Sequence, residues 1–125
     1  NRMELEILSD CPVDTPENVE MACDIVRGKG VRRVFVSLGK DGMFYKGPEG
    51  AIWGVSRAFD GMVNATGAGD ASLAGIIYAT RHGYSAEDTL AFGMGAGMVA
   101  ISSSDTISRE MSPAAIENMV KEYIK

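Results

Sequence analysis

The stretch "NATGAGDAS", residues 64–72, sets three small residues between a threonine and an aspartate, and the apolar residues "LAGIIYA" (73–79) follow at once. This order predicts a glycine-rich turn that opens a helix from about Ala68 to His82, with Gly83 ending it. The first N–H groups of such a helix lack partners within the helix, and the helix dipole adds a partial positive charge there. The turn is therefore suited to bind an anion.

Asp70, at the start of this apolar helix, looks like a buried carboxylate and has two interpretations. As a base, it would accept the proton of a substrate hydroxyl while the N–H groups stabilise charge on a transferring phosphoryl group. As an ordinary first-turn acid, it would only complement the helix dipole. The stretch alone leaves both interpretations open.

The composition of the 125 residues fits one globular domain, with 46% hydrophobic and 23% charged residues. A net charge of −5 argues against a general nucleic-acid or anionic-membrane surface. No apolar run approaches the roughly 18 residues of a membrane span. Cys11 and Cys23 lack a C-x-x-C spacing, which favours reduced thiols and a cytoplasmic protein. The sequence starts in mid-element without Met, so we expect a piece of a longer protein.

The remaining chain alternates helix signals with one strand and one hairpin, an order that suits part of an α/β layered domain. A buried strand of the kind found in parallel sheets is expected over 33–38, and a hairpin follows over 39–55. Helices are expected in "DTPENVEMACDIVRGKG" (14–30), "SAEDTLAFGMGAGMVAIS" (85–102) and "SPAAIENMVKEYIK" (112–125), with Thr15, Ser85 and Ser112 as N-caps. The second of these is apolar almost throughout and is expected to be buried on most faces.

Three further motifs are weak when taken singly. "SLGKDG" (37–42) can bring backbone close to phosphates or simply shape a hairpin. "NRME" (1–4) places Asn1 and Glu4 one helical turn apart, where they could order the water shell of a Mg²⁺ ion or lie on a solvated helix surface. "GMGAGMVA" (93–100) fails as a dinucleotide motif, so close helix packing is the favoured role of its small residues.

Together these motifs resemble one family. "VNATGAGDASLAGIIYA" (63–79) resembles the second signature of the ribokinase-like (PfkB) carbohydrate and nucleoside kinases. "NRME" is similar to the N-x-x-E magnesium-and-phosphate motif of that family, and "VFVSLGKDGMFY" (34–45) to its strand and nucleotide-side turn. The resemblance implies the C-terminal, ATP-side part of a ribokinase-like three-layer α/β/α (Rossmann-like) domain over residues 1–125.

The same resemblance assigns site residues. Asp70 matches the catalytic base, and the N–H groups of Gly67, Ala68 and Gly69 match the anion hole. Asn1 and Glu4 match the Mg²⁺-side pair, acting through water, and Asn64 and Thr66, with the loop from Ser103 to Thr106, match a region where relatives hold a monovalent cation such as K⁺. Many relatives have aspartate at position 64, so this chain carries one negative charge fewer there. ATP is expected beside Ser37, Gly39, Gly42, Met94, Gly97, Ser103 and Thr106.

The implied reaction is phosphorylation of a primary hydroxyl on a small molecule by ATP. Segments 14–42 and 102–112 resemble the pseudouridine kinases most, which implies the 5′-hydroxyl of pseudouridine as acceptor. The alternatives are a sugar or sugar-phosphate kinase, like ribokinase or 1-phosphofructokinase, and a non-catalytic nucleotide-binding or interaction module. Family members are roughly twice as long as this chain, within the range of a single α/β domain. We therefore expect the chain alone to be inactive, and its parent enzyme could form a homo-oligomer.

Overall fold

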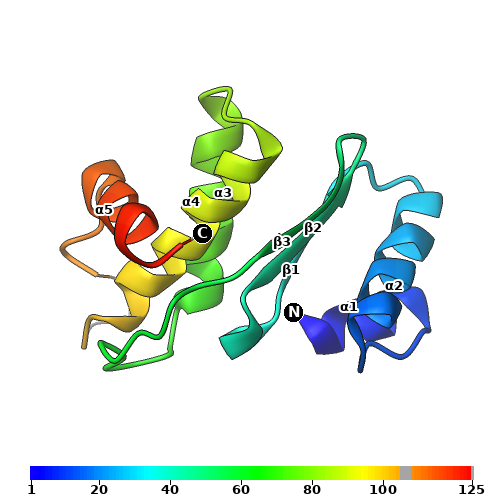
Figure 1. The fold of residues 1–125 in the computed structure, drawn as a ribbon, viewed down its shortest axis with the longest axis horizontal. Helices are drawn as coiled ribbons and strands as arrows, with labels where there is room; N and C mark the ends of the chain where they lie inside the picture. The colour runs from blue at the N-terminus through cyan, green and yellow to red at the C-terminus, as the bar shows by residue number, and fades with distance from the viewer. Residues whose placement is uncertain (105–107, 125) are drawn as a thin grey trace. The chain divides into compact units, whose positions relative to one another are not determined.

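Two helices and a three-stranded sheet form the first unit of the chain, Asn1–Trp53, with the last strand ending at Gly54 (Figure 1). The computed structural model describes residues 1–104 and 108–124. The elements of this unit are α1 (Arg2–Ser9), α2 (Pro16–Gly28), β1 (Val34–Ser37), the 3₁₀ turn η1 (Gly39–Asp41), β2 (Met43–Gly47) and β3 (Gly50–Gly54).

Helix α2 begins where the capping signal predicts. The Thr15 hydroxyl accepts the N–H of Asn18 at 3.2 Å, and Pro16 occupies the first helical position. Proline is favoured there because the missing N–H would have no partner inside the helix. The helix ends at Gly28, within the predicted stop region. The local sequence is therefore sufficient to place α2.

The strands form in the order β1-β2-β3, and β1 pairs antiparallel with β2 in the register Val36↔Phe44. The hairpin predicted for 39–55 is confirmed, with Pro48 and Glu49 at its turn. The expectation of a parallel-sheet strand differs from this pairing. The connection from Ser37 to Met43 is too short for a parallel crossover, which needs a dozen or more residues, so β2 must return antiparallel.

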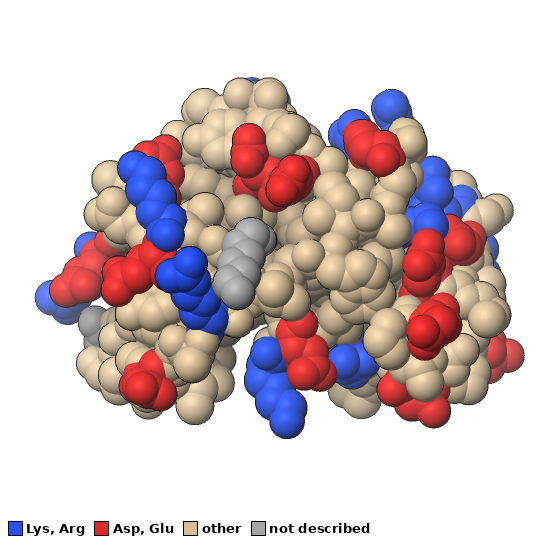
Figure 2. All heavy atoms as spheres, in the orientation of Figure 1, with Lys and Arg blue, Asp and Glu red and all other residues tan. Residues whose placement is uncertain are grey.

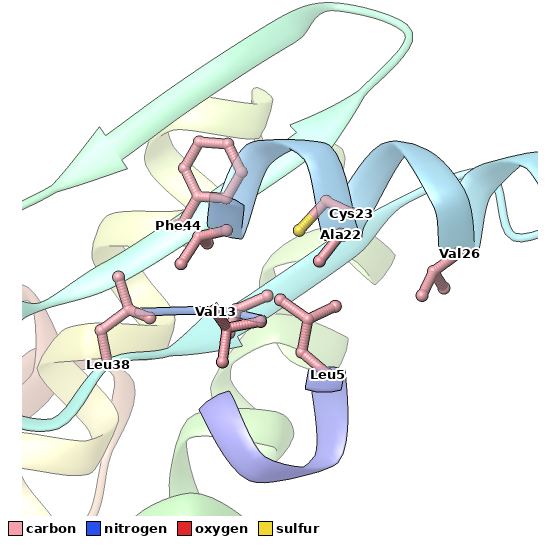
Figure 3. Packing of buried hydrophobic residues seen from close by; sticks show 9 residues of the cluster. Leu5, Val13, Ala22, Cys23, Val26, Leu38 and Phe44 are labelled. Carbon is pink, nitrogen blue, oxygen red and sulfur yellow. The ribbon is translucent and has the colours of Figure 1, made fainter. Parts of the chain in front are cut away.

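One buried cluster joins α1, α2 and the sheet, as Figure 3 shows. Leu5 comes from α1, Cys23 from α2, and Phe44 from β2, and all three are almost fully buried. Burial raises the pKa of the Cys23 thiol to about 11, because the thiolate would lose its hydration. Both cysteines are unpaired, as the spacing predicts.

Partly buried ion pairs connect α2 to strand β2 of the sheet. The Lys46 ammonium on β2 lies 2.6 Å from Glu20 Oε1 and 3.7 Å from Asp24 Oδ1. The hydrogen bond to Glu20 contributes most to raising the pKa of Lys46. Since only 17% of the Lys46 side chain is exposed, solvent screens this pair less than it screens a surface pair.

Three helices form the second unit, Gly54–Lys125: α3 (Ala68–Arg81), α4 (Ala86–Ile101) and α5 (Pro113–Tyr123) (Figure 1). The predicted N-caps Ser85 and Ser112 are confirmed, each accepting an N–H three residues on. Helix α3 ends one residue before the predicted end. Helix α4 is buried from Thr89 to Ala100 except at Ala91, as its composition predicts.

Glycines allow α4 to approach both of its neighbours closely. A Cβ added at Gly93 would lie 2.7 Å from Ile76 Cγ1 of α3. A Cβ added at Gly95 would lie 2.9 Å from Val120 Cγ2 of α5 and 3.0 Å from the Ile116 carbonyl. The small residues of "GMGAGMVA" therefore serve helix packing, as the sequence favoured.

The described residues include no helix that is long and apolar enough to cross a membrane. On the face that Figure 2 shows, Lys and Arg side chains lie interspersed with Asp and Glu side chains. This mixed surface is consistent with the acidic net charge of −5.

We predict that Glu49 makes the stability of the first unit depend on pH in the acidic range. Its carboxylate accepts the Tyr45 hydroxyl and lies 2.9 Å from Arg33, and these contacts, led by the Tyr45 bond, lower the pKa of Glu49 to about 2 from 4.5. A lowered folded-state pKa stabilises the fold above the unfolded value, and this stabilisation is lost as pH falls through about 2.

The test compares melting temperatures of wild type and Glu49→Gln between pH 7 and pH 2. The wild type is expected to melt higher at pH 7, and the gap should close as the pH falls from about 4.5 toward 2. A gap that stays constant over this range would contradict the assignment.

Candidate functional site

The turn that opens α3 has the geometry of an anion-binding helix start. Gly67 has φ 85°, a left-handed conformation that favours glycine, and no side chain caps the helix. The Ala68 N–H makes only a long 3.4 Å bond to the Ala65 carbonyl. Within residues 1–104 and 108–124, the N–H groups of Gly69 and Asp70 find no acceptor. These donors are therefore available to a ligand.

Asp70 is exposed, which corrects the impression of a buried carboxylate. It shares a face of α3 with Leu73 and Ile77, which are 57% and 55% exposed, whereas Gly75 and Ala79 are buried. In the part of the chain that the structure describes, no hydrogen bond or ion pair engages the Asp70 carboxylate. The side chain is thus free to meet a substrate, and it makes no cap to the helix.

Gly97 packs directly against this turn. A Cβ at Gly97 would lie 2.5 Å from Ser72 Oγ and 3.5 Å from the Ala68 carbonyl, both on the first turns of α3. Met94, one turn earlier, is buried, and its Sδ lies 2.5 Å from where a Cβ of Gly54 would stand. Both residues predicted to line adenine thus have packing contacts, and Gly97 adjoins the predicted anion hole. Sequence reasoning missed Ser72, because no local pattern reveals a contact between helices.

The loop before α3 is tied to the end of α4. The N–H groups of Val63 and Asn64 donate to the Ile101 carbonyl at 2.7 and 3.1 Å. Asn64 Oδ1 in turn accepts the Thr66 N–H at 3.0 Å. The backbone of the predicted cation residue Asn64 therefore lies at the end of α4, where Ile101 precedes Ser103 by two residues. Thr106, also predicted for the nucleotide, lies outside the described residues.

The second group of predicted residues lies in the first unit, at the turn after β1. Gly39 and Gly42 have φ values of 61° and 94°, conformations that side chains disfavour. The Leu38 N–H donates to the Gly42 carbonyl at 2.9 Å and closes the turn. Ser37 ends β1 and is half-buried, while Gly39 is exposed. The turn thus presents backbone that a ligand could approach closely.

Asn1 and Glu4 form a capping box at the start of α1. Asn1 Oδ1 accepts the Glu4 N–H at 3.0 Å, and the backbone nitrogen of Asn1 donates to Glu4 Oε2 at 2.6 Å. Both side chains are exposed, and no group of three His, Cys, Asp or Glu side chains able to hold a metal occurs in the described residues. Exposed amide and carboxylate oxygens fit a Mg²⁺ ion that keeps most of its waters.

Arg2, which the motif reasoning passed over, joins α1 to the glycine turn. Its guanidinium donates to the Val13 carbonyl and to Asp41 Oδ2, both at 3.0 Å. The first unit therefore brings Asn1 and Glu4 into one connected group with residues 37–42. In the second unit, Gly97 adjoins the first turn of α3 and the Asn64 backbone is bonded to Ile101 at the end of α4, whereas the Asp70 side chain lies on the exposed face of α3.

We predict that Gly97→Ala costs about 0.5–2 kcal/mol of unfolding free energy, because the added methyl crowds the Ser72 hydroxyl and this overpacking exceeds the roughly 1 kcal/mol that alanine gains over glycine within a helix. Removing the obstructing hydroxyl with Ser72→Ala should restore most of that loss in the double variant. Urea unfolding of the two single variants and the double variant measures this coupling. A Gly97→Ala protein as stable as wild type would show that the contact carries no strain.

Comparison with known proteins identifies the family to which this chain is similar. A family model described as pfkB family carbohydrate kinase matches residues 1–113. The 1-phosphofructokinase of Haemophilus influenzae is 30% identical over 112 residues, which cover 90% of this chain and 36% of that protein. The pseudouridine kinase of Escherichia coli is 28% identical over 121 residues, which cover 97% of this chain and 39% of that protein.

A solved structure agrees with these relatives. Arabidopsis thaliana ribokinase, complexed with ribose and ATP, matches with a TM-score of 0.87 and 26% identity, over 97% of this chain and 39% of that one. The chain thus spans less than two fifths of the length of the proteins compared here. It has part of the ribokinase-like α/β fold, and it belongs to the pfkB family of carbohydrate kinases.

Proposed function

We propose that this chain is the C-terminal, ATP-side portion of a longer kinase, which transfers the γ-phosphoryl group of ATP to a primary hydroxyl of a small nucleoside or sugar. One observation carries the proposal: an uncapped helix start with unpaired N–H groups holds a free, exposed carboxylate, Asp70, in its first turn. Family membership supports it, because the matched relatives are kinases by name. We call the longer protein the complete kinase.

In this mechanism, Asp70 accepts the proton of the acceptor hydroxyl as its oxygen attacks the γ-phosphorus of ATP. The bond from the γ-phosphorus to the bridging oxygen breaks, and ADP leaves with the electron pair. The N–H groups of Gly67, Ala68 and Gly69 stabilise the negative charge on the transferring group, helped by the dipole of α3. Phosphoryl transfer needs mainly such positioning and charge stabilisation.

ATP would lie against two separate parts of the chain. Its phosphates and ribose would meet the turn of Ser37, Gly39 and Gly42. Its adenine would meet the end of α4 and the residues after it, from Met94 and Gly97 to Ser103 and Thr106. The left-handed glycines and the exposed backbone of the first turn support this assignment.

Two ions belong to the proposal. Asn1 and Glu4 would hold the waters of a Mg²⁺ ion, which would neutralise phosphate charge when bound. Asn64 and Thr66, with the residues after α4, would lie near a K⁺ ion. The bonds that tie Asn64 to Ile101 support a shared location for these groups.

Exposed apolar side chains support the view that the chain is part of a longer protein. Leu73 and Ile77 follow Asp70 along one face of α3 and are more than half exposed. Contiguous exposed apolar side chains can mark a surface that another segment covers. We propose that the rest of the complete kinase covers this face beside Asp70.

The proposed acceptor is pseudouridine, phosphorylated at its 5′-hydroxyl. Segments 14–42 and 102–112 resemble the pseudouridine kinases, and the E. coli relative of that name matches 97% of this chain. A second candidate is a sugar phosphate such as fructose 1-phosphate. The 30% identity to the H. influenzae 1-phosphofructokinase, slightly above the 28% of the pseudouridine kinase, favours that candidate.

We predict that the complete kinase has a higher kcat/KM for pseudouridine than for fructose 1-phosphate or ribose. Steady-state kinetics with each acceptor, at saturating ATP and Mg²⁺, measure this preference. A tenfold preference for fructose 1-phosphate, about 1.4 kcal/mol in transition-state binding, would select the second candidate.

We predict that Asp70→Asn in the complete kinase lowers kcat by about 10²–10⁴-fold, because asparagine cannot accept the proton. The KM for ATP should change little, since the N–H groups remain. Asp88→Asn is a matched control: Asp88 is an exposed first-turn acid on α4, so its loss removes a similar dipole interaction. Near-normal kcat in Asp70→Asn would exclude Asp70 as the base.

A further inference from the structure

The Arg2 guanidinium bonds two segments that are distant along the chain. Nη1 donates to the Val13 carbonyl, between α1 and α2, and Nη2 donates to Asp41 Oδ2 in η1. Asp41 is 39 residues away from Arg2 in sequence. Through this one side chain, α1, the α1–α2 connection and the glycine turn are linked by directional bonds.

The buried core joins the same three segments. Leu5 of α1, Val13 of the connection and Leu38, directly before Gly39, belong to one cluster (Figure 3). Apolar contacts are non-directional, so they hold segments together without setting the orientation of each one. A planar guanidinium with donors in a fixed fork adds that orientation.

The segments that Arg2 connects carry the two groups proposed to act on the phosphates. Asn1 caps helix α1, which contains Glu4, and the turn contains Gly39 and Gly42. We propose that Arg2 is a positioning residue that holds the start of α1 in register with the turn 37–42, using Asp41 as its anchor. The inference rests on the proposed function, and it assigns no contact between Arg2 and substrate.

Stability alone would give this pair a small role. The Arg2 and Asp41 side chains are 38% and 56% exposed, and pairs at such exposure add little to folding stability. A positioning role can therefore be distinguished from a structural one. If Arg2 is a positioning residue, breaking the pair should change nucleotide binding while the melting temperature stays nearly constant.

The experiment uses Arg2→Ala, Asp41→Asn and their double variant in the complete kinase. Each single variant is expected to raise the KM for ATP, and the Mg²⁺ concentration for half-maximal rate, by about threefold to tenfold, with kcat within about twofold. The double variant should be no worse than the more affected single one, because Arg2→Ala already removes the Arg2–Asp41 ion pair that Asp41→Asn weakens. Arg2→Lys should fall between, since a single ammonium cannot reproduce the two-donor fork.

Arg33→Ala is the matched control. It breaks the Arg33–Glu49 pair, which has a similar distance of 2.9 Å and similar exposures of 43% and 40%, but which lies at the hairpin turn. Its KM for ATP and its Mg²⁺ requirement should equal those of wild type. Melting temperatures of all variants verify that each one is folded, and Asp41→Asn decides if Arg2→Ala does not fold.

Three outcomes would overturn the inference: an unchanged KM in both single variants, multiplicative effects in the double variant, or an equal change in Arg33→Ala. Failure of the proposed function looks different. It would show as a wild-type complete kinase that phosphorylates none of the acceptors, or as an Asp70→Asn variant with normal kcat. An active wild type with unaffected Arg2 variants rejects the positioning role alone.

Discussion

The close approach of α3 to α4 is the constraint on which the candidate catalytic turn depends. Gly75, Gly93 and Gly97 stand where any Cβ would lie within 2.8 Å of an atom across the interface. Because packed interiors leave no room to adjust, these contacts determine how the first turn of α3 lies on α4. The buried residues of α3 face α4, and Asp70 is consequently on the opposite, exposed face.

Helix α4 can serve both of its neighbours because it is made of small and apolar residues from Leu90 onward. Gly93 and Gly97 admit α3, and Gly95 admits α5. The same composition is what suggested a nucleotide-binding motif. A glycine-rich sequence within a helix and a glycine-rich phosphate loop share residue types, and only the preceding element distinguishes them. Here the glycines lie well inside α4, where their lack of a side chain serves packing.

The first unit relies on a different kind of constraint. Its core is apolar and joins α1, α2 and the sheet, and polar bonds at its surface add direction. Lys46 of β2 forms ion pairs with Glu20 and Asp24 of α2, and Arg2 of α1 forms an ion pair with Asp41. The glycine turn after β1 thus receives its conformation from its own left-handed residues and its orientation from a residue far away in sequence.

Local sequence alone predicted most of the elements and the glycine turn that opens α3. Thr15, Ser85 and Ser112 start their helices because a cap is an interaction over three residues, and the turn at Gly67 follows from neighbouring glycines. Local sequence did not predict four features: the exposure of Asp70, the antiparallel pairing of β1, the contact of Gly97 with Ser72, and the bond from Arg2 to Asp41. Each of these depends on which segments meet in space, and packing between distant residues decides that.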